Sequence, residues 1–96
     1  MIRAAAQRDI ENAQDWYLGH APEHVTRFVD QLSAAIARFR ARPYAFPTLR
    51  QDARRATLRV FPYEVWYRVH DELQLIEVLA LVHDRQDPER FGDRVL

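Results

Sequence analysis

Histidine and arginine side chains directly follow the last apolar run of this sequence. After Leu73–Val82 come His83, Asp84 and Arg85. A histidine can carry a proton near neutral pH, and a neighbouring guanidinium can bind an anion such as a phosphate. In the alternative interpretation, His83 closes the end of a sheet and Arg85 pairs with Asp84 or Asp87. For this triplet taken alone, the structural interpretation is favoured.

Arginine provides all fourteen basic residues of the chain, which has no lysine and no net charge. Codon usage is enough to explain the missing lysine. The local distribution is more informative, because residues 38–68 contain eight arginines and only two acidic residues. This excess coincides with the expected strands. It indicates an acidic partner, which can be a peptide, a nucleic acid or an acidic protein surface.

Within this stretch, Arg55 and Arg59 are expected to share one face of a strand, roughly 13 Å apart. That spacing suits successive phosphates or carboxylates, which guanidinium groups bind with paired hydrogen bonds. A solvated strand face is the alternative for any single arginine, whereas the set favours a functional surface. We also count Arg54 and the expected outward-facing Trp66 as candidate contacts.

Other chemistries lack the residues they require. The chain has no cysteine, which excludes disulfides and thiolate metal ligands. His20, His24 and His70 are dispersed without a partner at ligand spacing, so we expect no metal site and no cofactor. Two glycines are too few for a glycine-rich phosphate loop, and no serine or cysteine nucleophile constellation is visible.

The elements that position these residues follow from hydrophobic periodicity. Spacings of three and four residues predict helices over 4–18 and from Pro22 to about Arg42. Alternating apolar residues predict strands over 57–61, 63–69 and 73–82. We therefore expect one α+β domain, residues 1–96, in which an antiparallel helical hairpin packs on a sheet of three consecutive antiparallel strands. No signal peptide or membrane span is visible, which is compatible with the cytoplasm.

The last predicted strand is apolar on both faces. Ile76, Val78, Ala80 and Val82 are expected to face the helices, while Leu73, Leu75, Leu79 and Leu81 form an opposite face that only Glu77 interrupts. A strand of this kind needs a cover on both sides. The last fourteen residues can shield part of the outer face with Phe91, but they are mostly charged. We therefore expect an exposed apolar groove that binds another molecule.

Several short segments, taken in order, resemble the RelE/ParE superfamily of toxins from bacterial type II toxin–antitoxin modules, which are also known as plasmid stabilisation proteins. They are Ala5–Ile10, Asp15–Tyr17, Arg27-Phe28, Pro43, Phe46-Pro47, Arg54-Arg55, Phe61–Tyr63, Tyr67–Val69, Val82–Arg85 and Asp87-Pro88. The ending is more similar to the ParE branch than to the RelE branch. The resemblance implies two helices on a small antiparallel sheet. This chain departs from the family in its N-terminal first strand, which is short or missing because only residues 1–4 precede the alanine-rich segment. Either that strand is lost or the start codon is placed a few residues late.

For function, the resemblance implies a toxin that blocks DNA gyrase by binding, with a cognate antitoxin whose C-terminal segment wraps it. Target binding is expected at Arg54, Arg55, Arg59, Trp66 and Arg85. The antitoxin is expected to contact Leu75, Leu79, Leu81 and Phe91, and a lone chain to self-associate. One alternative is a RelE-like nuclease that cleaves mRNA in the ribosome with Arg59, His83 and Arg85. Another is a degenerate member that retains only antitoxin binding.

Overall fold

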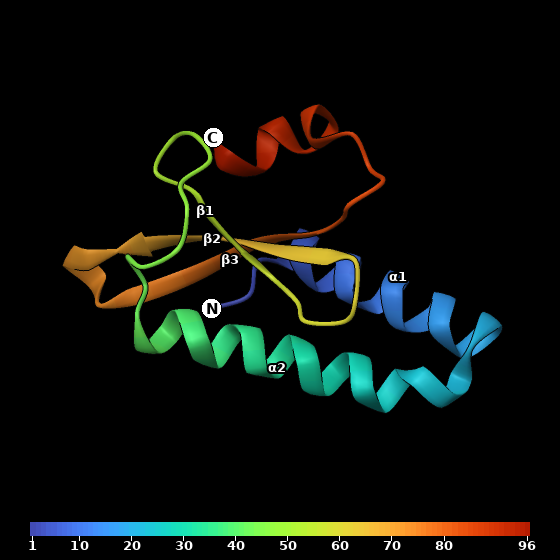
Figure 1. Ribbon diagram of the computed structural model, residues 1–96. Helices are drawn as coiled ribbons and strands as arrows, with labels where there is room; N and C mark the ends of the chain where they lie inside the picture. The colour runs from blue at the N-terminus through green and yellow to red at the C-terminus, as the bar shows by residue number, and fades with distance from the viewer.

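The structure, a computed structural model that describes residues 1–96, consists of three layers (Figure 1). Two helices lie on one face of a three-stranded sheet, and a 3-10 helical segment at the C-terminus lies on the other face. The elements are α1 (Ala4–His20), a 3-10 turn (Pro22–His24), α2 (Val25–Ala41), β1 (Arg54–Thr57), β2 (Tyr63–His70), a second 3-10 turn (Asp71–Leu73), β3 (Leu75–His83) and the C-terminal segment (Pro88–Val95). The expected α+β class is confirmed.

The helices form where the apolar stripes predict them. On α2 the buried residues Phe28, Leu32, Ala35 and Phe39 recur every three or four positions, which places them on one side of the helix. Pro22 opens the preceding turn, where its missing N–H costs no hydrogen bond. The two helices cover the sheet face that carries the larger core. No helix of the structure is long and apolar enough to cross a membrane.

The sheet has the predicted order, with β2 hydrogen-bonded between β1 and β3, and both pairs are antiparallel. On β2 the predicted faces are also confirmed. Tyr63, Val65, Tyr67 and Val69 belong to the core beneath the helices, while Trp66 belongs to a second cluster on the opposite face. In this article the face away from the helices is called the outer face of the sheet.

The first strand lies earlier in the chain than the predicted 57–61. β1 ends at Thr57, and residues 58–62 form a tight turn in which the Leu58 N–H donates to the Tyr63 carbonyl. Val60 at the tip of this turn has a positive φ of 75°. Arg59 is therefore in a turn and does not share a strand face with Arg55, so the expected pairing of these two arginines along one strand is wrong.

A β-bulge in β3 reverses the predicted alternation of its second half. Trp66 pairs with Ala80 and Tyr67 pairs with Val78, which leaves Leu79 as an extra residue without a partner on β2. As a result, Leu81 packs in the core beneath the helices, while Val82 packs in the cluster on the outer face. The sequence prediction had assigned these two residues the opposite way, because strict alternation cannot include an inserted residue.

The predicted short first strand is present as a single bridge. Ile2 forms a parallel bridge with Val78, the Arg3 N–H donates to the Val78 carbonyl, and the Val78 N–H donates to the Met1 carbonyl. The terminal amine of Met1 also donates to the Ile76 carbonyl. Residues 1–3 therefore cover part of the β3 edge, which would otherwise be open for pairing with another chain.

The C-terminal segment covers the outer face of the sheet, where the sequence predicted an open groove. Val95 is buried against a cluster that contains Trp66, Leu79 and Val82, and the Phe91 ring packs edge-on against the Trp66 indole. Leu79 has no exposed surface. The expected apolar groove is therefore filled by the chain itself, although the segment is mostly charged. Self-association was expected through this face or through the unpaired sheet edge, and the burial removes the first of these two surfaces.

Candidate partner-binding site

Three arginines of the predicted basic surface donate hydrogen bonds to backbone carbonyls of the chain itself. Arg54 donates from Nη1 to the carbonyls of Tyr44 and Phe46, and its guanidinium lies over the Tyr44 ring. Arg68 donates to the carbonyls of Gln51 and Val95. Arg38 donates to the carbonyl of Thr57. Because their guanidinium donors are engaged with backbone carbonyls, these arginines hold the 42–53 connector, the C-terminal segment and the β1 edge in place.

Arg55 remains available at the surface. Its side chain is about half exposed on the outer face, and its nearest acidic partner is Glu64 at 3.9 Å. An exposed ion pair at this distance contributes little to stability and leaves the guanidinium free to bind another anion. Arg55 is therefore accessible for the target contact that the sequence predicts, whereas Arg54 is largely occupied by its contacts with the connector.

Arg59 and Arg85, like Arg55, are exposed. Arg59 lies in the 58–62 turn and Arg85 in the 83–86 turn, and neither forms an ion pair within the chain. The two turns lie against each other, because the Asp84 N–H donates to the Pro62 carbonyl at 2.8 Å. These two turns are called the turn end of the sheet. His83 lies at the same end, so all three residues of the predicted nuclease set are found at one end of the sheet.

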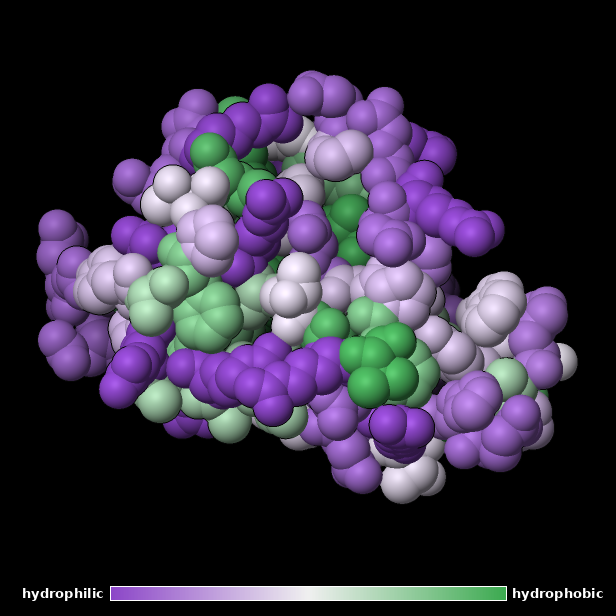
Figure 2. Space-filling view, in the orientation of Figure 1, coloured by the Kyte–Doolittle hydropathy of each residue, from purple (hydrophilic) through white to green (hydrophobic).

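The turn end also exposes an apolar residue that sequence reasoning missed. Val60 is 70% exposed and adopts a left-handed backbone conformation, which is uncommon for a β-branched residue. Strained surface positions of this kind cluster at binding sites. Hydrophilic side chains cover most of the face shown in Figure 2, with small hydrophobic patches between them. The combination of Arg59 and Val60 at one protruding tip offers both a charge and an apolar contact.

His83 is held in a defined tautomer. The Arg85 N–H donates to His83 Nδ1 at 3.0 Å, so a neutral ring carries its proton on Nε2. The Asp84 carboxylate lies 3.2 Å from the same Nδ1, a contact that becomes an ion pair only when the ring is protonated. The His83 backbone N–H donates to Gln86 Oε1, and the ring packs edge-on against Tyr63. The ring is therefore held at Nδ1 and by its packing against Tyr63, which serves either a structural or a proton-transfer role.

Trp66 is not a surface contact. It is 3% exposed beneath the C-terminal segment, and its indole N–H donates to the Glu64 carboxylate. The expectation that Trp66 binds a target is wrong in geometry, because the cover of the outer face comes from a segment distant in sequence. Leu79 and Leu81 are likewise buried, and Leu81 lies on the helix side. Of the predicted antitoxin contacts, only Leu75 and Phe91 keep partly exposed side chains.

Leu75 lines an apolar groove beside the start of β3, where the N-terminus runs along the strand edge. The groove has a volume of about 490 Å³, and seven of its nine lining residues are hydrophobic. They come from the N-terminus, α2 and β3 and include Ile2, Ile36 and Phe39, with Arg40 as the one charged member. We call it the edge groove. It is a different surface from the groove that the sequence predicted, which lay over the outer face of the sheet and shares only Leu75 with it.

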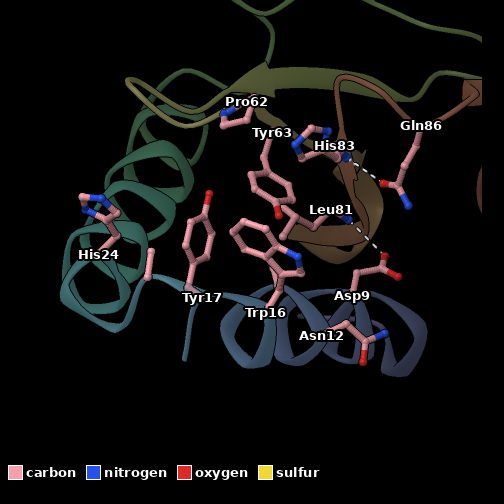
Figure 3. A pocket seen from close by; sticks show the side chains of 12 residues that line it. Asp9, Asn12, Trp16, Tyr17, His24, Pro62, Tyr63, Leu81, His83 and Gln86 are labelled. Atoms are coloured by element: carbon pink, nitrogen blue, oxygen red, sulfur yellow. Dashed lines mark hydrogen bonds between the residues drawn. The ribbon is translucent and has the colours of Figure 1, made fainter. Parts of the chain in front are cut away.

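A second concavity, larger than the edge groove, lies between α1 and the turn end (Figure 3). Its volume is about 660 Å³, and aromatic rings from three elements line it. Trp16 and Tyr17 come from α1, Tyr63 begins β2, and His83 ends β3, as Figure 3 shows. We call it the aromatic cleft. The sequence indicated that Tyr17 is a core residue, and its burial confirms this, but it did not show that Trp16 borders a cleft.

The Tyr63 phenol at this cleft is strongly perturbed. Burial raises the pKa of Tyr63 to about 12, with a further contribution from the Tyr17 hydroxyl beside it. Burial also raises the pKa of Tyr17. Both phenols therefore stay protonated at physiological pH.

In the whole structure, no group of three or more histidine, aspartate or glutamate side chains is placed so that it could hold a metal ion.

Comparisons with known proteins agree with this architecture. The sequence matches the model of a protein family described as the ParE toxin of the type II toxin–antitoxin system, parDE, over residues 1–88. No curated protein is significantly similar in sequence. A solved structure, the chromosomal ParDE TA system from P. aeruginosa, shares the fold with a TM-score of 0.73 at 19% sequence identity, over 85% of this chain and 90% of that chain. Because the family match spans residues 1–88 of 96, this chain belongs to the ParE toxin family.

Proposed function

We propose that this chain is the toxin of a type II toxin–antitoxin module that inhibits DNA gyrase by binding, and that a cognate antitoxin neutralises it. The observation that carries this proposal is membership of the ParE toxin family over residues 1–88. The solved relative comes from a two-component toxin–antitoxin system, which supports the existence of an antitoxin partner for this chain as well.

The target surface in this proposal is the turn end of the sheet together with Arg55. Arg59 and Arg85 are exposed and form no ion pair within the chain, and Val60 adds an exposed apolar side chain next to Arg59. Arginine is enriched among the residues that dominate binding energy at protein interfaces. The proposed partner of this end of the molecule is therefore an acidic protein surface.

A supercoiling assay with purified gyrase tests the target. We expect the protein to inhibit supercoiling, and Arg59→Glu with Arg85→Glu to weaken inhibition more than tenfold, because charge reversal repels an acidic partner. Arg27→Glu is the matched control, since Arg27 is exposed on α2 without an ion pair and lies outside the turn end. Circular dichroism verifies that all variants fold. If the unsubstituted protein does not inhibit supercoiling, the gyrase proposal is contradicted.

A second function is favoured by the meeting of Arg59, His83 and Arg85 at one end of the sheet. Two guanidiniums beside an imidazole can hold a phosphate and move a proton, as a ribosome-dependent mRNA endonuclease requires. Induction in bacteria followed by mapping of mRNA 5′ ends separates the two functions. Cleavage that disappears with His83→Ala identifies the nuclease. Toxicity that survives His83→Ala, without mRNA cleavage, supports binding alone.

For the antitoxin, we propose the edge groove as the anchoring surface. Its apolar walls and Arg40 at the rim fit a segment with apolar anchors and an acidic flank. Leu75 retains its predicted role in this proposal, and Leu79 and Leu81 act only as supporting core. Phe91 is a peripheral contact in this arrangement, because it packs on Trp66 on the outer face.

Co-purification with the product of the neighbouring reading frame tests this surface. Leu75→Glu is expected to weaken the complex at least tenfold, since it introduces a charge into an apolar contact. Leu73→Glu provides the matched control, because Leu73 is 69% exposed in the adjacent turn and does not line the groove. Equal loss of binding for both variants, with both folded, would place the antitoxin elsewhere.

A further inference from the structure

Val60, at the tip of the 58–62 turn, has a backbone conformation that its own fold does not explain. We propose that Val60 is the apolar anchor of the target contact, and that its strained backbone holds the side chain ready to enter a small apolar depression beside an acidic group of a protein target. The inference rests on the proposed function, because it concerns the same turn end. It adds the residue that distinguishes a protein target from a nucleic acid.

The backbone of Val60 lies in a region that β-branched residues avoid. Its φ of 75° is left-handed, and three other non-glycine residues also have a positive φ: Gln51, Asp52 and Gln74. Those three side chains are polar, so Val60 is the one apolar and β-branched residue among the four. Glycine or asparagine would adopt this conformation at a lower cost. The strain therefore indicates a use of the valine side chain beyond the geometry of the turn.

No contact inside the chain accounts for the Val60 side chain. It is 70% exposed and belongs to neither of the two apolar clusters that flank the sheet. A side chain that stays in water gains little free energy from burial when the chain folds. Single exposed apolar residues are common at protein surfaces, but they rarely occupy a backbone conformation that disfavours them. The gain that offsets the strain therefore lies outside the free chain.

The turn is held in place on both sides of its tip. Leu58 and Phe61 are buried in the core beneath the helices. The Leu58 N–H donates to the Tyr63 carbonyl and the Tyr63 N–H donates to the Phe61 carbonyl, both at 2.9 Å. The Pro62 carbonyl accepts from the 83–86 turn at 2.8 Å. Val60 is therefore presented by a backbone that is already ordered, which lowers the entropy cost of binding.

The neighbouring residue defines the rest of the complementary surface. Arg59 is exposed and forms no ion pair within the chain, so the tip presents one cation directly next to one apolar side chain. A guanidinium binds a carboxylate with paired hydrogen bonds, and an isopropyl group gains free energy where it leaves water. The matching surface is therefore a small apolar depression with an aspartate or glutamate at its rim.

A nucleic-acid target would use this tip differently. Phosphates bind arginine side chains, and that binding depends on charge and weakens as the salt concentration rises. The Val60 side chain carries no charge, so its removal should leave phosphate binding unchanged. Dependence of activity on the Val60 side chain therefore separates a protein target from a nucleic acid.

Two measurements on Val60→Asn test the inference. Asparagine tolerates a positive φ but lacks the branched apolar side chain. We expect the urea midpoint of this variant to equal or exceed that of the unsubstituted chain, because the strain is relieved. We expect its inhibition of gyrase supercoiling to weaken by about tenfold or more, because the anchor is lost.

Two further variants serve as controls. Val60→Ile keeps a branched apolar side chain on the strained backbone, and it should retain inhibition within about threefold. Leu73→Asn is the matched control, because Leu73 is 69% exposed in the turn at the other end of the sheet. It should leave inhibition unchanged within about twofold, as expected for a surface position outside the contact.

Failure of the anchor is distinguishable from failure of the gyrase proposal. If Val60→Asn inhibits gyrase as well as the unsubstituted protein does, the anchor is overturned while the gyrase proposal stands. If its urea midpoint falls, the fold itself requires the valine, and the inference is likewise overturned. If the unsubstituted protein does not inhibit gyrase, the gyrase proposal fails, and the same variants are compared for growth arrest on induction. Arrest that Val60→Asn weakens then supports an anchor on another protein target, whereas unchanged arrest, or no arrest at all, overturns the inference.

Discussion

Arg94 donates hydrogen bonds to both carboxylate oxygens of Asp9, at 2.7 Å and 3.1 Å, although the two residues are 85 positions apart. The same guanidinium donates to the Leu79 carbonyl, and Asp9 accepts from the Leu81 N–H. Asp9 and Arg94 therefore pair with backbone groups on the part of the β3 edge that residues 1–3 do not reach. They also join the C-terminal segment to α1. Hydrogen bonding to Asp9 raises the pKa of Arg94 above its ordinary value, so the Arg94 guanidinium remains positively charged.

Removal of the Asp9 carboxylate should destabilise the fold. Asp9→Ala leaves a partly buried guanidinium and the Leu81 N–H without their acceptor, and we expect the free energy of unfolding to fall by about 1.5–3 kcal/mol. Urea denaturation measures this change. Asp15→Ala, an exposed position on the same helix, should stay within about 0.5 kcal/mol. Equal effects of the two substitutions would show that the Asp9 pair has no special role.

Leu79 should behave as a core residue. Because it has no exposed surface, Leu79→Ala is expected to lower the free energy of unfolding by about 2–5 kcal/mol, through lost burial and a residual cavity. Chemical denaturation of the isolated chain measures the change, and the exposed Leu18→Ala serves as the reference. A change no larger than that of Leu18→Ala would mean that the C-terminal segment does not cover Leu79 in solution.

Glu77 should make the fold sensitive to acid. Burial by itself would raise its pKa, but hydrogen bonds from His70 and Arg3, and the charge of Arg3, lower the pKa below its ordinary value of 4.5. The stabilisation is therefore fully present above about pH 4.5 and is lost as the pH falls through the lowered pKa of the folded state. Urea midpoints between about pH 7 and pH 3 should decline less for Glu77→Gln than for the unsubstituted chain. Parallel pH profiles would contradict this account.

Tyr63 should contribute to the loss of stability at alkaline pH. Burial, followed by the influence of Tyr17, raises its pKa from 10.0 to about 12. The unfolded chain then ionises first, so stability declines as the pH rises above about 10 and continues to decline up to the pKa of the folded state. Tyrosinate absorbance should show a late ionisation step that Tyr63→Phe removes. A single step near pH 10 for all four tyrosines would refute the assignment.

Several features could be predicted from the sequence because they depend on local periodicity. The stripe on α2 identified Phe28 and Leu32 as core residues, and alternation along β2 assigned both of its faces correctly. Pro43 correctly indicated where α2 stops. The order of segments also led to the correct family. Each of these depends on side-chain spacing within one element, which the backbone geometry of helices and strands converts directly into a face.

The sites were less predictable, because they depend on which distant segments meet. Hydrogen bonding between Asp84 and Pro62 joins the turns that carry Arg85 and Arg59, and no local pattern indicates this contact. The aromatic cleft likewise combines residues from α1 and from two strand ends. Trp16 and Tyr63 give no sequence signal of their proximity, since each is compatible with a core position taken alone.

The sequence by itself determined the class of fold, the strand order and the family, because these follow from the length, order and periodicity of its apolar segments. Tertiary structure alone decided which face each leucine of β3 occupies. The extra residue Leu79 exchanges the sides of Leu81 and Val82, and the C-terminal segment then buries Trp66 beneath Phe91 and Val95. A one-residue bulge leaves the composition and the apolar spacing unchanged, so only the pairing of β3 with β2 can reveal it.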